Sequence, residues 1–218
     1  TAGRGQAGNS WESEAGKNRL FSALLRYDGL LAINQWRLSM LVAVAMWDVL
    51  AQYLPDENLT IKWPNDIYWG DKKLVGILIE NSLSGKFVGY SIIGIGVNVN
   101  QAKWLSNAPN PISMLQITGE EYDAEMLMNK WICAMKSWEL RSTEEIKATY
   151  LQHLYRREGW HTYVEREVST APTAIAQQGV EGAFLAQFIG ITEQGELILR
   201  KENNEENIYH FKQIRFVL

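Results

Sequence analysis

The sequence lacks the features that mark a membrane protein, a disulfide-stabilised protein or a zinc protein. Its 218 residues contain no apolar run of about 18 residues, and the opening Thr-Ala-Gly-Arg has no charged-then-apolar signal pattern. A single cysteine, Cys133, excludes an internal disulfide. The three histidines are too far apart for zinc-ligand spacing. We therefore expect a cytoplasmic protein without a structural or catalytic zinc.

The chain also has little net charge. Its 21 Lys and Arg residues and 25 Asp and Glu residues give a formal net charge of −4 at pH 7. No basic helix, turn and second helix precede the predicted core, which is the pattern expected of a DNA-binding module. We therefore expect no DNA-binding domain in this chain and no binding to nucleic acid.

The chain does contain a large fraction of apolar residues, and these recur at the spacings typical of strands and helices. Hydrophobic residues make up 46% of the chain, enough for one large domain or for a medium domain and a small one. Strands are predicted at residues 20–25, 59–63, 67–69, 74–81 and 87–99. Helices are predicted from residue 34 to Pro55, over 123–140, and from a Ser142/Glu145 capping box to near Arg157. Closely spaced strands of this kind pair antiparallel.

The pattern changes after Gly159 to short strands without helices. They are predicted at residues 160–164, 182–191, 196–200, 207–211 and 214–218. Five short strands favour a small SH3-like β-barrel. We therefore expect two domains, residues 1–158 and 159–218. In the first, Cys133 lies within the second helix and is expected to be a buried, inert thiol.

The first candidate site is the glycine-rich segment at residues 3–8, Gly-Arg-Gly-Gln-Ala-Gly. Glycine lets backbone N–H groups approach an anion closely, and the guanidinium of Arg4 binds carboxylate or phosphate through two hydrogen bonds. Trp11 adds a flat face for a ring to pack against. No strand precedes the segment and no Lys-Ser/Thr follows it, so it is neither a P-loop nor a dinucleotide fingerprint. A plain surface loop remains the alternative.

The second candidate combines residues 62–66, Lys-Trp-Pro-Asn-Asp, with Lys73 and Gly76. Strict alternation along a strand places Lys73 and Gly76 on opposite faces. A fixed ammonium near the glycine-rich segment could neutralise charge that develops on a phosphate. The alternative is an ordinary solvent-facing lysine beside Lys72.

The third candidate is the strand at residues 94–100, Gly-Ile-Gly-Val-Asn-Val-Asn. Gly94 and Gly96 fall on the same face as Asn98 and Asn100. Glycine inside a strand costs stability and often marks a close approach by a ligand or another backbone. This strand is therefore predicted to form a wall of a site.

Together these motifs, in this order, resemble those of the biotin protein ligases. The resemblance covers residues 1 to about 100 strongly and the carboxyl-terminal module weakly, through residues 211–214, Phe-Lys-Gln-Ile. It implies an α/β (α+β) catalytic domain. That domain would have a mixed sheet with flanking helices, like the class II aminoacyl-tRNA synthetases, and an SH3-like domain would follow it.

The resemblance also implies a reaction, its substrates and its site residues. Biotin and ATP, with Mg²⁺, would give biotinyl-AMP, and biotin would pass to a lysine of a carboxylase's biotin carboxyl carrier domain; a homodimer is compatible with it. The catalytic residues implied are Lys73 and Arg4. The biotin-binding residues implied are Gly3, Arg4, Gly5, Gln6, Lys73 and Gly76. The nucleotide-binding residues implied are Trp11, Lys62, Asn65 and Asn98, with no dedicated protein metal site.

The sequence departs from the family pattern at two points. The upstream Ser-Thr-Asn motif that forms one side of the biotin pocket is absent. We expect an incomplete copy of the protein rather than an inactive form. The second departure is Gln6, where many relatives have arginine. Because a charge-assisted hydrogen bond is stronger than a neutral one, Gln6 is expected to retain biotinyl-AMP less well.

Three alternatives remain open. A lipoate ligase would share the fold and the acyl-adenylate chemistry, but its relatives lack the Trp-Pro-Asn-Asp sequence of residues 63–66. A biotin-sensing regulator would carry a basic winged helix. A non-catalytic interaction module is the third, and is expected if the chain is complete.

Overall fold

The computed structural model describes residues 3–4, 10–106, 108–166 and 182–218. The chain divides into two compact units, residues 1–155 and 156–218. The first contains one five-stranded sheet with helices and a short two-stranded ladder, and the second contains a separate five-stranded sheet. No helix in the described part of the chain is long and apolar enough to cross a membrane.

The sheet of the first unit has the order β3-β7-β6-β5-β4. Its strands are Arg19–Arg26 (β3), Leu59–Lys62 (β4), Asp66–Trp69 (β5), Lys72–Ser84 (β6) and Phe87–Val97 (β7). All five were predicted, with ends shifted by a few residues. Each described pairing between these strands is antiparallel. The expected mixed sheet is therefore not seen in the described residues, whose parallel pairing consists of two single bridges, Ile61–Leu154 and Lys73–Pro111.

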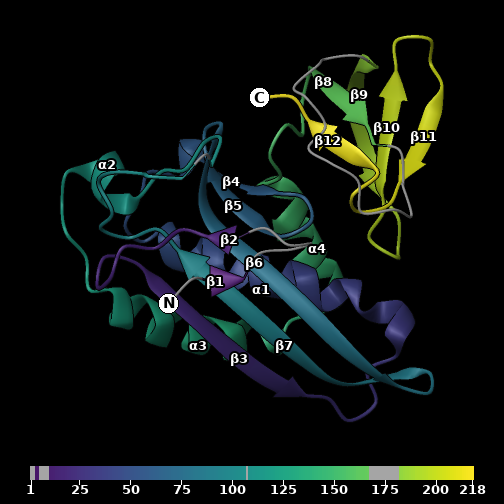
Figure 1. Cartoon of the computed structure of the whole chain (residues 1–218). Helices are drawn as coiled ribbons and strands as arrows, with labels where there is room; N and C mark the ends of the chain where they lie inside the picture. The colour runs from purple at the N-terminus through teal and green to yellow at the C-terminus, as the bar shows by residue number, and fades with distance from the viewer. Residues whose placement is uncertain (1–2, 5–9, 107, 167–181) are drawn as a thin grey trace. The chain divides into compact units, whose positions relative to one another are not determined.

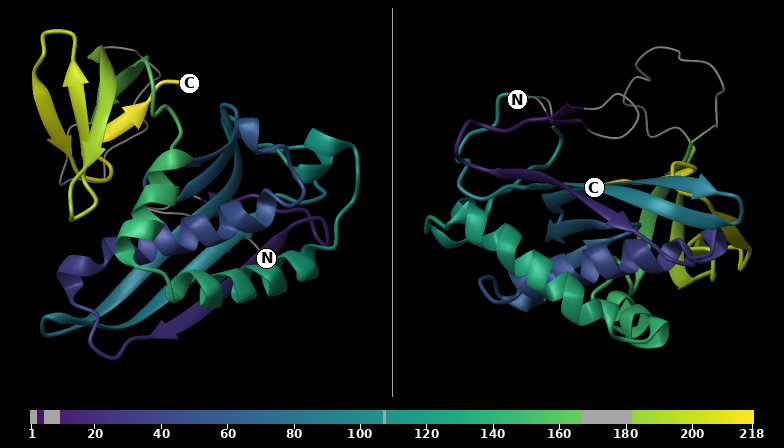
Figure 2. Two further views of the ribbon diagram at one scale, coloured as in Figure 1. Left: turned by 180° about the vertical axis from the view of Figure 1, so that it is seen from behind. Right: turned by 90° about the horizontal axis from the view of Figure 1, so that it is seen from below.

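Helices cover one face of this sheet. They are Trp36–Leu50 (α1), Ala124–Glu139 (α3) and Thr143–Gln152 (α4), with the short helix Met114–Thr118 (α2) in the segment after β7. Figure 1 and the right-hand view of Figure 2 show α1 and α3 on one side of the sheet and the ladder of Gly3–Arg4 (β1) with Ser10–Trp11 (β2) on the other. The core lies between sheet and helices, where α1 buries Val42, Ala43, Val44 and Ala45 completely.

The third predicted helix ends five residues before the expected end near Arg157. Its last residue is Gln152, and the chain then forms a bridge with β4. The backbone N–H of Ile61 donates to His153 O at 2.8 Å, and that of Tyr155 donates to Ile61 O at 2.9 Å. These hydrogen bonds to the sheet edge replace those of a further helical turn.

The Ser142 capping box is present as predicted. The Ser142 hydroxyl accepts from Glu145 N at 3.1 Å, and the Glu145 carboxylate accepts from Ser142 N at 2.9 Å. The hydrogen bond from the Ser142 backbone lowers the pKa of Glu145 from its ordinary value. Ser142 therefore satisfies one helix N–H and helps to orient the carboxylate that satisfies its own N–H.

We expect Ser142→Ala to lower the free energy of unfolding of the first unit by about 1 kcal/mol, the usual cost of losing an N-cap side chain. Urea denaturation followed by far-ultraviolet circular dichroism measures it. Ser137→Ala is the control, because Ser137 is exposed within α3 and caps no helix. An equal or smaller loss for Ser142→Ala than for the control would contradict the capping role.

The second unit consists of five antiparallel strands in the order β11-β10-β9-β8-β12. They are Trp160–Glu165 (β8), Ala183–Ile191 (β9), Leu197–Lys201 (β10), Glu206–Tyr209 (β11) and Ile214–Phe216 (β12). The turn between β9 and β10 needs Gly195, whose φ is 92°. Between β8, β10 and β11, the Glu165 carboxylate accepts from Lys201 Nζ at 2.9 Å and from Tyr209 Oη at 2.7 Å.

Candidate functional site

The candidate site lies on the face of the first sheet opposite α1 and α3. On this face the indole of Trp11 covers two glycines that pair directly across β6 and β7, Gly76 and Gly96. A Cβ atom added at Gly76 would lie 2.4 Å from Trp11 Cζ3, and one at Gly96 would lie 2.6 Å from Trp11 Cε2. Such separations are too short for real Cβ atoms. The two glycines therefore form a flat platform that only residues without side chains can provide.

Lys73 lies beside this platform, on the same face as Gly76. Its Cε atom is 3.1 Å from the position of a Cβ at Gly76, and its Nζ atom is 5.8 Å from the centroid of the Trp11 ring. The prediction that Lys73 and Gly76 occupy opposite faces was therefore wrong. A bulge between β5 and β6 is the reason: Ile67 pairs with Val75, whereas Tyr68 pairs with Lys73. Leu74 is the extra, unpaired residue of β6, and it shifts the alternation of side chains so that Lys73 lies on the same face as the platform.

The Lys73 ammonium has a defined partner, Asp66, which the sequence analysis included in the second candidate motif without giving it a role. Asp66 Oδ2 accepts from Lys73 Nζ at 2.5 Å, and Asp66 Oδ1 accepts from Ile77 N at 3.3 Å. About a third of the Lys73 side chain and a quarter of the Asp66 side chain remain exposed, at 32% and 24%. The ammonium is thus fixed in direction but still accessible to an anionic ligand. A carboxylate ending the Trp-Pro-Asn-Asp motif, opposite a strand that begins with lysine, was the available signal.

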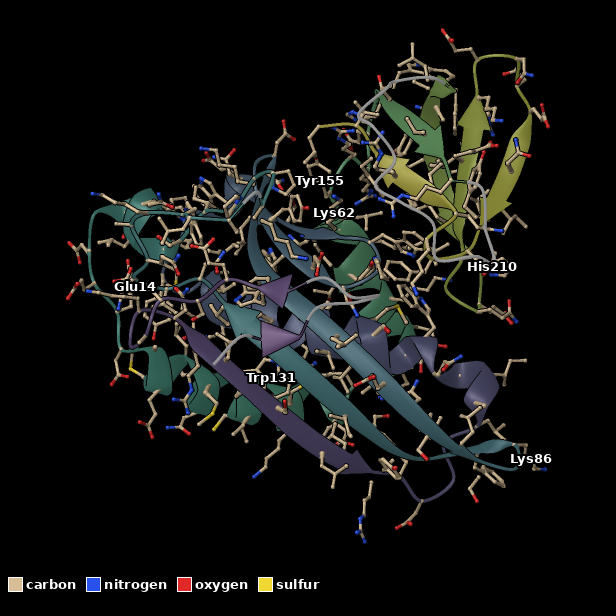
Figure 3. All side chains as sticks on the ribbon, viewed as in Figure 1. Glu14, Lys62, Lys86, Trp131, Tyr155 and His210 are labelled. Carbon is tan, nitrogen blue, oxygen red and sulfur yellow. The ribbon has the colours of Figure 1, made fainter. Side chains whose placement is uncertain are left out.

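Lys62 lies on the same sheet, at the end formed by β4 and β5. Its Nζ atom donates to Tyr68 Oη at 2.9 Å and lies 4.4 Å from the centroid of the Tyr68 ring. Tyr68 in turn packs against Tyr155, with ring centroids 5.4 Å apart. Figure 3 shows Lys62 and Tyr155 near this end of the sheet, with Lys86 at the far turn between β6 and β7. The structure therefore places Lys62 near the site, with its ammonium against the ring and hydroxyl of Tyr68.

The two candidate asparagines are buried, with 5% of Asn65 and 2% of Asn98 exposed. Asn98 Nδ2 donates to Lys73 O at 3.3 Å, which ties the end of β7 to the residue that carries the ammonium. Asn98 Oδ1 is buried and has no hydrogen-bond partner among the described residues. Since a buried polar atom without a partner is costly, this oxygen is suited to a ligand or a water.

Part of the predicted site lies outside the described residues. Gly5 and Gln6 belong to this part, as does the side chain of Arg4. The backbone of β1 and β2 is described, with Gly3 paired to Trp11 and Arg4 to Ser10. The structure therefore brings Gly3, Trp11, Lys73, Gly76, Gly96 and Asn98 to one region of the fold.

A hollow lined by described residues lies elsewhere on the first unit. It has a volume of about 640 Å³ and lies along α1 and α3, on the helix side of the sheet, between residues such as Asp48, Asp123 and Lys130. Cys133 lines it and is exposed, so the prediction of a buried thiol was wrong. The residues of α3 that enter the core are Leu127, Trp131 and Met135, four apart. Cys133 is two residues from Trp131 and therefore lies about 200° around the helix.

The comparisons with known proteins point to one family. The profile of the Biotin/lipoate A/B protein ligase family matches residues 1–98. A biotin–[acetyl-CoA-carboxylase] ligase of Paracoccus denitrificans is 32% identical over 204 residues, which cover 91% of this chain and 80% of that protein. The bifunctional ligase/repressor BirA of Bacillus spizizenii is 30% identical over 96% of this chain. The chain spans only 62% of the length of that relative.

Solved structures agree on the fold. The biotin protein ligase of Aquifex aeolicus, in complex with biotin and ATP, matches with a TM-score of 0.71 and 22% identity, covering 98% of this chain and 84% of that one. The biotin protein ligase of Leishmania major, in complex with biotinyl-5-AMP, matches with a TM-score of 0.62 and 19% identity. It covers 96% of this chain and 84% of that one. The mixed α/β fold with two antiparallel sheets is therefore that of these proteins.

Proposed function

Because this chain belongs to the biotin/lipoate A/B protein ligase family, we propose that it activates biotin with ATP and transfers it to a lysine of a biotin carboxyl carrier domain. The observation that carries the proposal is the arrangement of Trp11, the Gly76–Gly96 platform and Lys73 on one face of the sheet. An indole that lies flat on the two glycines beside a fixed cation suits a ligand with a ring system that ends in a carboxylate or a phosphate.

In the first step, a biotin carboxylate oxygen would attack the α-phosphorus of ATP, and pyrophosphate would leave. Lys73 would exchange part of its contact with Asp66 for the biotin carboxylate and the α-phosphate, and so disperse the charge on the pentacoordinate phosphorus. Arg4 would hold the same anions through its guanidinium. Gly3, Gly5 and Gln6 would contribute backbone and amide groups to the biotin side, where Gly76 lies beneath the Trp11 indole.

The nucleotide would lie near Trp11, Lys62, Asn65 and Asn98. Mg²⁺ would enter with the ATP phosphates, because this ion prefers oxygen ligands and keeps several waters. The buried, unpartnered Asn98 Oδ1 supports this assignment, since it is a neutral oxygen that can accept from a ligand or a water. When bound, the metal would supply charge neutralisation on the phosphates.

In the second step, the amine of a carrier lysine would attack the acyl carbon of biotinyl-AMP. An amide bond forms, the bond from the acyl carbon to the phosphate oxygen breaks and AMP leaves, while the lysine nitrogen, positively charged after the attack, loses a proton to solvent or to a nearby base. The partner we propose is the biotin carboxyl carrier domain of a carboxylase, with a homodimer of the ligase as a further arrangement.

We also propose a fold assignment for each of the two domains. We assign residues 1–158 to a class II aminoacyl-tRNA-synthetase-like ligase domain and residues 159–218 to an SH3-like barrel, with the boundary three residues beyond that between the two compact units. An antiparallel sheet with helices on one face supports the first assignment. Five short antiparallel strands support the second.

The family description includes lipoate, so the substrate requires its own experiment. Purified protein is incubated with ATP, Mg²⁺, a biotin carrier domain or a lipoyl domain, and the matching radiolabelled acid. We expect label on the biotin carrier domain alone, and none when its target lysine is replaced. Transfer of lipoate but not biotin would instead establish the lipoate ligase.

We expect Trp11→Ala to weaken ATP binding more than biotin binding, by about 1–2 kcal/mol for ATP, if the indole packs on the adenine. Isothermal titration with each ligand separately measures the two dissociation constants. An equal loss for both ligands would point instead to a general disturbance of the platform, because the indole covers Gly76 and Gly96 alike.

A further inference from the structure

Glu12, the residue that follows Trp11, connects its own segment to the segment after β7 through hydrogen bonds to its side chain. Glu12 Oε1 accepts from Gln101 Nε2 at 2.9 Å and from Leu105 N at 2.8 Å, and Glu12 Oε2 accepts from Ser106 N at 2.7 Å. All three donors belong to the segment after β7. One carboxylate thus satisfies two backbone N–H groups and one buried amide.

Gln101 completes the connection from the other side. It is 1% exposed, and its Oε1 atom accepts from Glu14 N at 3.0 Å and from Asn18 Nδ2 at 2.6 Å. Its Nε2 atom donates to Lys103 O at 2.9 Å as well as to Glu12. We call Glu12 and Gln101, with these partners, the Glu12–Gln101 clasp. It fastens residues 12–18 to residues 101–106.

The clasp joins two walls of the candidate site. Trp11 precedes Glu12 directly, and Gln101 follows Asn98 by three residues. Two further hydrogen bonds run between the same segments, from Asn100 N to Lys17 O at 2.7 Å and from Val99 N to Asn18 Oδ1 at 3.0 Å. Those two bonds involve Lys17 and Asn18, at the end of the segment away from Trp11. The hydrogen bonds of Glu12 are made by the residue directly after the indole.

The carboxylate is suited to this role by its charge. Hydrogen bonds from Ser106 and Leu105 lower the pKa of Glu12 from its ordinary value, so the group is ionised near neutral pH. An ionised acceptor makes shorter and stronger hydrogen bonds than a neutral one. A glutamine at this position would set an NH₂ group against at least one N–H donor.

We propose that Glu12 is a positioning residue, which holds the Trp11 indole on the Gly76–Gly96 platform so that the binding surface for nucleotide and biotin is formed before the substrates arrive. The inference rests on the proposed function for its kinetic consequence. It goes beyond that function because the hydrogen bonds of the Glu12 side chain run to Gln101, Leu105 and Ser106, and not to the platform glycines or to Lys73. A surface that is ordered in advance spares the ligand the cost of ordering it.

The test compares Glu12→Gln with Glu14→Gln, which makes the same change of charge two residues away on an exposed side chain. We expect Glu12→Gln to raise KM for ATP about tenfold, the scale of one lost charge-assisted hydrogen bond, with kcat within about twofold. Glu14→Gln should match the parent. A lower melting temperature with unchanged KM would overturn the proposal, because it would show a purely structural role.

A spectroscopic measurement separates this proposal from the proposed function. The fluorescence of Trp11 is obtained as the difference between each protein and its Trp11→Phe counterpart, and acrylamide quenching of that difference is recorded without substrates. We expect the quenching constant to rise at least twofold in Glu12→Gln and to stay unchanged in Glu14→Gln. If the parent proves inactive, the proposed function fails while this result still decides the clasp. Unchanged quenching in Glu12→Gln overturns it.

Discussion

Replacing Lys73 by alanine should lower the rate of biotinyl-AMP formation by about 10²- to 10³-fold, the usual effect of removing one preorganised charge at a transition state. The Lys73 ammonium lies 5.8 Å from the centroid of the Trp11 ring, and Asp66 holds its direction. Lys73→Arg should not restore the full rate, because a planar guanidinium does not reproduce a compact ammonium. Exchange of labelled pyrophosphate into ATP in the presence of biotin measures the step.

The matched control is Lys72→Ala, which removes the same charge from the neighbouring, exposed residue of β6. It should leave the exchange rate within about twofold of the parent, as expected for a solvated surface lysine. Circular dichroism and the melting temperature should show both variants folded, because the Lys73–Asp66 pair is partly exposed and contributes little stability. A Lys73→Ala protein that exchanges pyrophosphate at the parental rate would remove Lys73 from the mechanism.

The second large effect is expected at the platform. Gly96→Ala would place a methyl carbon 2.6 Å from Trp11 Cε2, so the indole must leave its position on the sheet. Overpacking of this kind costs about 1–3 kcal/mol, which corresponds to a loss of roughly 5- to 150-fold in kcat/KM if the energy is taken from substrate binding. Steady-state kinetics with ATP and biotin varied in turn measure the loss.

Gly89→Ala is the control for the same strand. An added Cβ at Gly89 meets only ordinary contacts, the nearest being Ser82 O at 3.7 Å. Both substitutions remove the entropic cost of a glycine in a strand, so neither should lower the melting temperature through the backbone. If the two variants show the same kcat/KM, the close packing of Trp11 on Gly96 is not needed for activity.

Local patterns in the sequence predicted much of the fold. Alternating and apolar stretches located all five strands of the first sheet, because their buried residues follow the period of the sheet. The capping box at Ser142 located the start of α4 for a local reason, the need to satisfy helix N–H groups. The short α2 was not predicted. Its own capping box, Ser113 with Gln116, was the available signal, but five residues are too few for helical periodicity.

Tertiary context decided what the sequence could not predict. The β-bulge at Leu74 depends on how β6 pairs with β5, and strict alternation therefore placed Lys73 on the wrong face. The partnership of Lys73 with Asp66 depends on the same pairing. The Glu12–Gln101 clasp joins residues 89 apart in sequence, and no local pattern contains such a contact. The resemblance named the platform glycines and Trp11 separately, whereas only the structure shows them in contact.

The most direct test of the proposed function is pyrophosphate release by the purified protein, followed with ATP alone, with biotin alone and with both. We expect release only when biotin and ATP are present together, because the biotin carboxylate is the nucleophile that displaces pyrophosphate. Lipoate in place of biotin should give no release above background. Release of pyrophosphate from ATP without biotin, or no release with both substrates and Mg²⁺ present, would contradict the proposal.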